Sequence, residues 1–122
     1  MRQPALNLMD DRTVKRINYK RGSTAPEIRV KLIDEGTREP YDLEDIDVSI
    51  RFYMLDNAGE MVQLFDRPCT VDITKTTEAF YSWGLGDLNF SGAAYCCFAF
   101  VDSVADTTAI YPKNNYVMLE VY

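Results

Sequence analysis

Apolar and polar residues alternate along most of this chain with the period of two that is typical of β-strands. The clearest example is the segment IDVSIRFYML, residues 46–55. Its apolar positions, which share one face of a strand, are Ile46, Val48, Ile50, Phe52 and Met54. A strand with one face in the core and the other in solvent has this pattern. We therefore predict that residues 46–55 form the central strand of the core.

Shorter segments repeat the alternation. Residues 27–34 place Ile28, Val30 and Leu32 on one face and charged residues on the other. The sequence DNAG, residues 56–59, has the asparagine and glycine that favour a hairpin turn. Further strands are expected at residues 60–65, 69–74, 78–83, 93–101 and 116–122. Seven to eight short strands at this spacing predict an antiparallel β-sandwich.

Charge divides the chain into two parts. The 122 residues have a net charge of −6, but residues 1–31 contain eight basic and three acidic residues. Residues 32–122 contain five basic and sixteen acidic residues. The sequence RGSTAP, which begins at Arg21, has the composition of a linker. We therefore predict a basic, extended N-terminal arm with its linker at residues 1–25 and a folded β-sandwich at residues 26–122.

The basic arm has three interpretations. It is a solvated tail, as termini often are, or it binds an acidic surface of another subunit, such as a second copy of the chain. Nucleic acid is disfavoured, because the segment lacks interleaved glycines and an aromatic stacking platform. We prefer binding to another subunit. The expected contact residues are Leu6, Leu8, Arg12, Lys15, Arg16, Ile17, Tyr19, Lys20 and Arg21.

Three stretches of the body are together similar to a known family. They are VKLIDEGTREPYDLEDIDVSIRFYMLDNAGE, AFYSWGLGDLNFSGAAYCCFAF and YPKNNYVMLEV. The matching positions are Asp34, Gly36, Pro40, Asp42, Leu43, Tyr81, Trp83, Asp87, Gly92, Pro112 and Tyr116. In this order they resemble the N-terminal domain of upper baseplate proteins from tailed phages that infect Gram-positive bacteria. The resemblance covers residues 26–122, and it implies an immunoglobulin-like sandwich that serves the virion as a non-enzymatic assembly module.

The glycine-rich segment at residues 79–100 is interpreted as architecture. Trp83 is expected to fill the centre of a two-sheet core, because large aromatic residues dominate such cores. Asp87 is expected to accept backbone N–H groups in a turn. The full set of expected turn residues is Asp34, Gly36, Asp87 and Gly92. The expected core residues are Ile28, Val30, Leu32, Val48, Ile50, Phe52, Trp83, Phe98 and Phe100.

Catalytic chemistry finds little support in the residue types. The chain contains no histidine, so Ser–His–Asp and Cys–His mechanisms are excluded. Adjacent Cys96 and Cys97 would point to opposite faces of a strand, which favours free, packed thiols over a disulfide framework. The acidic sequence DLEDID, residues 42–47, could bind calcium, receive a neighbour's basic arm or face solvent, and its spacing is not that of an EF-hand. We expect no catalytic residue, no metal site and no cofactor.

The sequence therefore predicts a structural protein of a tailed-phage virion, in the tail, baseplate or neck. Its expected partners are other virion proteins and copies of itself, without membrane or nucleic acid. No apolar run is long enough to span a bilayer, and the N-terminus lacks a secretion signal. We therefore expect synthesis in the host cytoplasm and a final location in the virion. The alternative is a capsid-decorating or host-carbohydrate-binding module, with Tyr53, Tyr95, Tyr111 and Tyr116 as candidate contacts.

Overall fold

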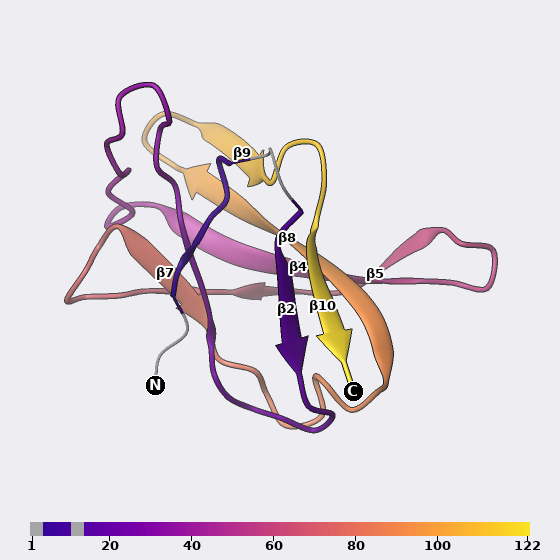
Figure 1. Ribbon diagram of the computed structural model, residues 1–122. Coiled ribbons are helices and arrows are strands. Elements are labelled where there is room, and N and C mark those ends of the chain that lie inside the picture. The colour runs from indigo at the N-terminus through magenta and orange to yellow at the C-terminus, as the bar shows by residue number, and fades with distance from the viewer. Residues whose placement is uncertain (1–3, 11–13) are drawn as a thin grey trace.

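Strands and turns make up the fold shown by the computed structural model, which describes residues 4–10 and 14–122 (Figure 1). Ten strands and no helix occur within these residues. The strands are β1 (Leu6–Asn7), β2 (Arg16–Tyr19), β3 (Ile28–Lys31), β4 (Asp47–Leu55), β5 (Met61–Pro68), β6 (Thr70–Val71), β7 (Glu78–Tyr81), β8 (Gly92–Asp102), β9 (Thr107–Tyr111) and β10 (Val117–Val121). The prediction of an all-β fold is confirmed.

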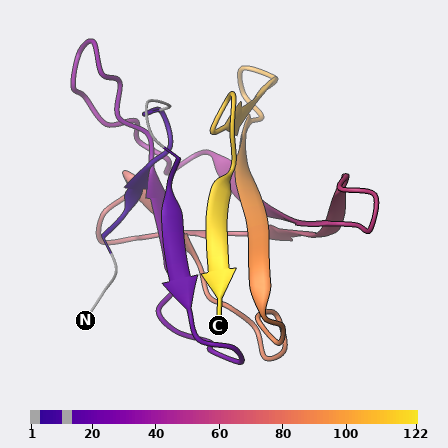
Figure 2. The same ribbon diagram turned by 45° about the vertical axis from the view of Figure 1, so that its right-hand side comes forward.

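The strands form two mixed sheets. The four-stranded sheet has the order β1-β3-β7-β6, and the six-stranded sheet has the order β2-β10-β8-β4-β5, with β9 also paired to β8. Figure 2 shows β2, β10 and β8 side by side. The pairs β1–β3 and β2–β10 are parallel, whereas the remaining pairs are antiparallel. The prediction of wholly antiparallel sheets with seven to eight strands was wrong, because the N-terminal segment and residues 107–111 contribute further strands.

One hydrophobic core joins the two sheets. Trp83 lies within it, with its ring edge-on to the rings of Tyr19, Phe52 and Tyr81 at centroid distances of 5.5, 6.0 and 5.2 Å. The alternation predicted for the central strand is present, since Val48, Ile50 and Phe52 are buried, Met54 is partly buried, and the outward side chains of β4 are not buried. All the residues expected in the core are buried: Ile28, Val30, Leu32, Val48, Ile50, Phe52, Trp83, Phe98 and Phe100.

The N-terminal segment also belongs to this core. Leu8, Ile17 and Tyr19 are 0%, 6% and 2% exposed, and the hydroxyl of Tyr19 donates to the carbonyl of Pro26 at 3.1 Å. The prediction that residues 1–25 form an arm outside the sandwich was therefore wrong for the part that the structure describes. The physical reason is the alternation in RINY, which allows β2 to pair with β10 and to bury its apolar face.

The hairpin of β4 and β5 projects beyond the rest of the molecule, at the right of Figure 1. Its turn follows the prediction from DNAG: Oδ1 of Asp56 accepts the backbone N–H groups of Ala58 and Glu60 at 2.9 Å each. Gly59 has a φ of 79°, which favours glycine there. A register shift leaves Leu64 as an extra residue between the pairs Phe52–Phe65 and Tyr53–Gln63. The hairpin is therefore an ordered element with a β-bulge, and most of β5 is exposed.

Candidate functional site

Three tyrosines gather on the outer face of the six-stranded sheet, which is the face turned away from the core. Tyr53 comes from β4, Tyr95 from β8 and Tyr116 from the segment just before β10. The ring of Tyr116 lies edge-on to those of Tyr53 and Tyr95, with centroid distances of 5.5 and 6.3 Å. The hydroxyl of Tyr53 donates to Oε1 of Gln63 at 3.2 Å, which connects the cluster to β5. Residues far apart in sequence thus form one aromatic cluster.

Two hollows adjoin this tyrosine cluster. One, of about 350 Å³, is lined by Tyr53 and Tyr116 together with Arg51, Lys113 and Asn114. The other, of about 220 Å³, is lined by apolar side chains, including Val14, Met61, Tyr95, Tyr116 and Met118. The first hollow combines aromatic rings with cationic and amide groups. The second is an apolar groove with walls from β5, β8, β10 and the segment just before β2. Both can receive part of a ligand or of another protein.

The sequence analysis found only part of this surface. It proposed the tyrosines, and three of them lie together, but Tyr111 packs against Phe100 in the core at a centroid distance of 5.9 Å. It missed Met61 and Met118. The available signal was an apolar residue at an outward position of each strand, where the alternation calls for a polar residue.

β5 is an exposed edge strand. It pairs with β4 on one side, and no described strand pairs with its other side. The side chains of Leu55, Met61, Val62 and Leu64 are 49%, 36%, 42% and 54% exposed. An exposed edge with apolar side chains is a template for pairing with another chain, and soluble proteins usually block such edges. This edge is therefore a candidate contact surface.

Two contacts fix β5 to the core without covering its free edge. Nη1 of Arg67 donates to Oδ1 of Asp87 at 2.7 Å and to the hydroxyl of Tyr81 at 2.8 Å. Within β5, the guanidinium of Arg67 also lies 4.1 Å from the ring centre of Phe65. Asp87 also accepts the N–H of Gly84 at 2.7 Å, which is the turn role predicted for it. Burial raises the pKa of Asp87, but its hydrogen bonds from Tyr81, Arg67 and Gly84 outweigh that effect and hold the pKa below its usual range.

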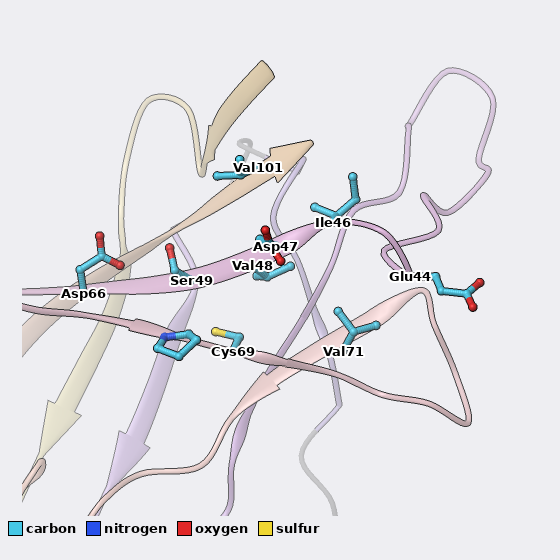
Figure 3. A pocket seen from close by; sticks show the side chains of 10 residues that line it. Glu44, Ile46, Asp47, Val48, Ser49, Asp66, Cys69, Val71 and Val101 are labelled. Atoms are coloured by element: carbon cyan, nitrogen blue, oxygen red, sulfur yellow. The ribbon is translucent and has the colours of Figure 1, made fainter. Parts of the chain in front are cut away.

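An acidic cleft of about 500 Å³ lies where the chain leaves β5 for β6 (Figure 3). Asp66, Asp47 and Glu44 lie along it, and the Cys69 thiol lies on its opposite side with Val71. Burial raises the pKa of Cys69 to about 12, so the thiol is protonated at neutral pH and is a poor nucleophile. The acidic residues come from DLEDID and from β5, and we interpret the cleft as a charged continuation of the β5 edge.

The opposite edge of the same sheet is basic. β2 is its terminal strand, and Arg16, Lys20 and Arg21 on or next to β2 are exposed. Arg21 also donates from Nε to Oδ1 of Asn89 at 3.3 Å. The residues predicted to contact a partner therefore divide into two groups. Leu8, Ile17 and Tyr19 are core residues, whereas the basic side chains of β2 lie at a surface; Lys15 and Leu6 are partly buried, and Arg12 lies outside the described residues.

A buried ionic network holds the four-stranded sheet together. The guanidinium of Arg29, only 3% exposed, contacts Asp72 at 2.5 Å, Glu78 at 3.1 Å and Glu27 at 3.3 Å. Hydrogen bonds from Thr74 and then from Arg29 lower the pKa of Asp72. Burial raises the pKa of Glu78, but hydrogen bonds from Lys75 and Arg29 outweigh that effect and hold the pKa below its usual range. The network is an internal set of ion pairs, so the charged face of residues 27–34 is buried at Arg29.

The remaining turn residues act as hydrogen-bond acceptors or as turn backbone. Oδ1 of Asp34 accepts the N–H groups of Gly36 and Thr37 at 2.8 and 3.2 Å. Gly92 begins β8 with a φ of 124°.

Within residues 4–10 and 14–122, no three carboxylate or cysteine side chains are grouped so that they could hold a metal ion, and no helix is present that could cross a membrane. Comparison of the chain with models of protein families and with curated protein sequences gave no match.

Proposed function

We propose that this chain is a non-enzymatic structural subunit of a tailed-phage virion, with a place in the tail, baseplate or neck. The observation that carries the assembly part of the proposal is the free edge of β5 on the projecting hairpin. Its exposed apolar side chains suit a contact with another subunit, and they add no stability to the chain while they remain exposed to solvent. Other virion proteins or copies of the chain are the proposed partners.

We further propose that the two sheets form an immunoglobulin-like sandwich of the variable type. In that fold the strands A, B, E and D form one sheet, and G, F, C and C′ form the other. The orders β1-β3-β7-β6 and β10-β8-β4-β5 follow the same sequence of neighbours, with the difference that β1 runs parallel to β3. This agreement supports the resemblance to the N-terminal domain of upper baseplate proteins, which is the reason for proposing a phage virion.

The test uses a phage that encodes this chain. Deleting its gene is expected to give incomplete, non-infectious particles, and the wild-type chain supplied from a plasmid should restore them. Leu64→Lys should fail to restore them, because it places a charge on the β5 edge. Val104→Lys is the matched control, since Val104 is 91% exposed in the loop before β9. Complete, infectious particles without the chain would contradict the proposal.

The tyrosine cluster favours a second candidate function, binding of host carbohydrate. Sugars stack on aromatic rings and hydrogen-bond to amide and cationic groups, and the hollow beside Tyr53 and Tyr116 presents Arg51, Lys113 and Asn114. Binding of the purified chain to a glycan surface, lost in Tyr116→Ala and retained in Tyr122→Ala, would favour this function. Tyr122 is a suitable control because it is 71% exposed and does not line the hollow.

A further inference from the structure

We infer that copies of this chain associate head to tail, with the basic β2 edge of one copy against the acidic β5 edge of the next. This inference deepens the proposed assembly role and rests on it, because it names the partner and the two surfaces that meet. Three independent features support the inference: unpaired backbone at both ends of one sheet, opposite charge on those ends, and exposed apolar side chains at the contact.

Both terminal strands of the six-stranded sheet have a free side. The hydrogen bonds from Met118 to Lys15 (2.8 Å), from Tyr122 to Tyr19 (3.0 Å) and from Arg21 to Tyr122 (2.7 Å) join β2 to β10. In a parallel strand pair, the residues between these positions direct their backbone groups to the other side. Arg16 and Asn18 therefore point their backbone N–H and C=O groups away from β10, where no described strand pairs with them.

β5 presents the complementary edge. Its eight residues pair only with β4 among the described strands, so its other side is available along its length. The strand β2 has four residues, Arg16–Tyr19, and strands rise about 3.3 Å per residue. Half the length of β5 is therefore enough to pair with β2 and to continue one sheet from subunit to subunit.

The charges on the two edges are opposite. Arg16, Lys20 and Arg21 are exposed at the β2 edge. The β5 edge has Glu60 at the hairpin turn and Asp66 near its end, and the acidic cleft continues the edge with Asp47 and Glu44. Arg67 forms an ion pair with Asp87, and Arg51 forms one with Asp66 at 3.4 Å. The charge that this side offers to a partner therefore comes from Glu60, Asp47 and Glu44. Complementary charge of this kind sets the orientation of a contact and opposes the wrong pairing of two like edges.

Apolar side chains give the contact its attraction at short range. Val62 and Leu64 are exposed on β5, and Val14, just before β2, is 56% exposed. Burial of apolar side chains is the main favourable term in most protein association. Because the two surfaces differ, the contact is heterologous, and a heterologous contact repeats until the subunits close into a ring or extend as a filament.

The experiment measures association of the purified full chain by sedimentation equilibrium and uses two charge-reversed variants. The basic-edge variant is Arg16→Glu with Lys20→Glu, and the acidic-edge variant is Glu60→Lys with Asp47→Lys. The wild type is expected to form oligomers. Each variant alone should associate about a hundredfold more weakly, because like charges then meet across every contact. Mixing the two variants should restore oligomers, because each reversed edge then meets an edge of opposite charge.

Controls separate this result from a general effect of charge or folding. Arg38→Glu with Ser103→Glu and Val104→Glu changes the net charge by the same amount as the basic-edge variant, in loops outside both edges, and should associate like the wild type. Raising the salt from about 0.1 M to about 1 M should weaken wild-type association, since the Debye length falls from about 10 Å to about 3 Å. Restoration on mixing also shows that both variants are folded.

A wild-type chain that stays monomeric at every concentration, or variants that associate normally, would overturn the inference. Failure to recover oligomers on mixing, while each variant retains the wild-type circular dichroism spectrum, would overturn it as well. These measurements need no phage particle. Their failure is therefore distinct from failure of the proposed virion function, which is decided by particles that lack the chain.

Discussion

At the scale of single residues, Arg29 shows how a charged side chain can belong to the interior of a small β-protein. Its alternating neighbours predict a solvent-facing position, yet it is buried against carboxylates from β6–β7 and from Glu27. A buried guanidinium is tolerated because several carboxylates neutralise it and accept its hydrogen bonds. The partners Asp72 and Glu78 lie more than 40 positions away in sequence, so a local pattern could not reveal them.

Replacement of Arg29 is therefore expected to be strongly destabilising. Arg29→Met removes the shared partner of Asp72 and Glu78 and should lower the free energy of unfolding by about 3 kcal/mol, as breaking a buried ion pair does. Urea denaturation measures this change. Lys75→Met removes an exposed partner of Glu78 and should cost less than about 1 kcal/mol. Equal effects of the two substitutions would contradict the assignment of Arg29 to the interior.

At the scale of elements, β2 is the strand that determines whether the N-terminal segment is free or part of the fold. Ile17 is 6% exposed in β2, whereas the adjacent Asn18 faces solvent. Ile17→Ala should lower the free energy of unfolding by about 2–4 kcal/mol, because it leaves a cavity beside the core. Asn18→Ala should change it by less than about 0.5 kcal/mol. Thermal unfolding followed by circular dichroism separates the two outcomes.

Removal of residues 1–21 is the stronger form of the same prediction. It deletes β1 and β2, exposes the edge of β10 and removes three buried side chains, Leu8, Ile17 and Tyr19. We expect the truncated chain to lose its cooperative unfolding transition and to aggregate. A truncated chain that stays monomeric and unfolds like the full chain would show that the segment is an arm after all.

The sequence revealed elements whose evidence is local and missed those that depend on distant partners. The period-two alternation of residues 46–55 and the turn residues of DNAG are both contained in a short window, and the structure has them as β4 and its hairpin. The pairing of β2 with β10 joins residues about 100 positions apart. The alternation in RINY covers only four residues, and the basic charge around it favours the interpretation as an arm. The tyrosine cluster could not be predicted as a cluster for the same reason, because Tyr53 and Tyr116 are brought together only by the order of strands in the sheet.

At the scale of the whole molecule, the charges have a consistent arrangement. Basic residues lie at the β2 edge, and acidic residues lie at the β5 edge and its cleft. One ionic cluster, around Arg29, lies in the four-stranded sheet, and another joins Arg67 of β5 to Asp87. Exposed charges at the edges contribute little to folding and are available for association. The buried clusters contribute to folding, and their carboxylates are therefore the groups that make stability depend on pH.

Stability is accordingly expected to fall in acid. Asp72, Glu78 and Asp87 all have pKa values in the folded chain below their usual ranges, so the unfolded chain binds protons more readily than the folded one. Their contribution is complete above the unfolded pKa values of about 3.9 for Asp and about 4.3 for Glu, and it is lost as the pH falls through the lower folded values. The urea midpoint should thus stay level from neutral pH to about pH 5 and then decrease steadily.

Variants assign this acid response to the buried clusters. Glu78→Gln should be less stable than the wild type at neutral pH, but its urea midpoint should fall less between neutral and acid pH, because one linked proton has been removed. Glu44→Gln, at the exposed cleft, is the matched control and should follow the wild-type curve. If the midpoint of the wild type rose on acidification, repulsion within a chain of net charge −6 would govern its pH response and the ionic clusters would not.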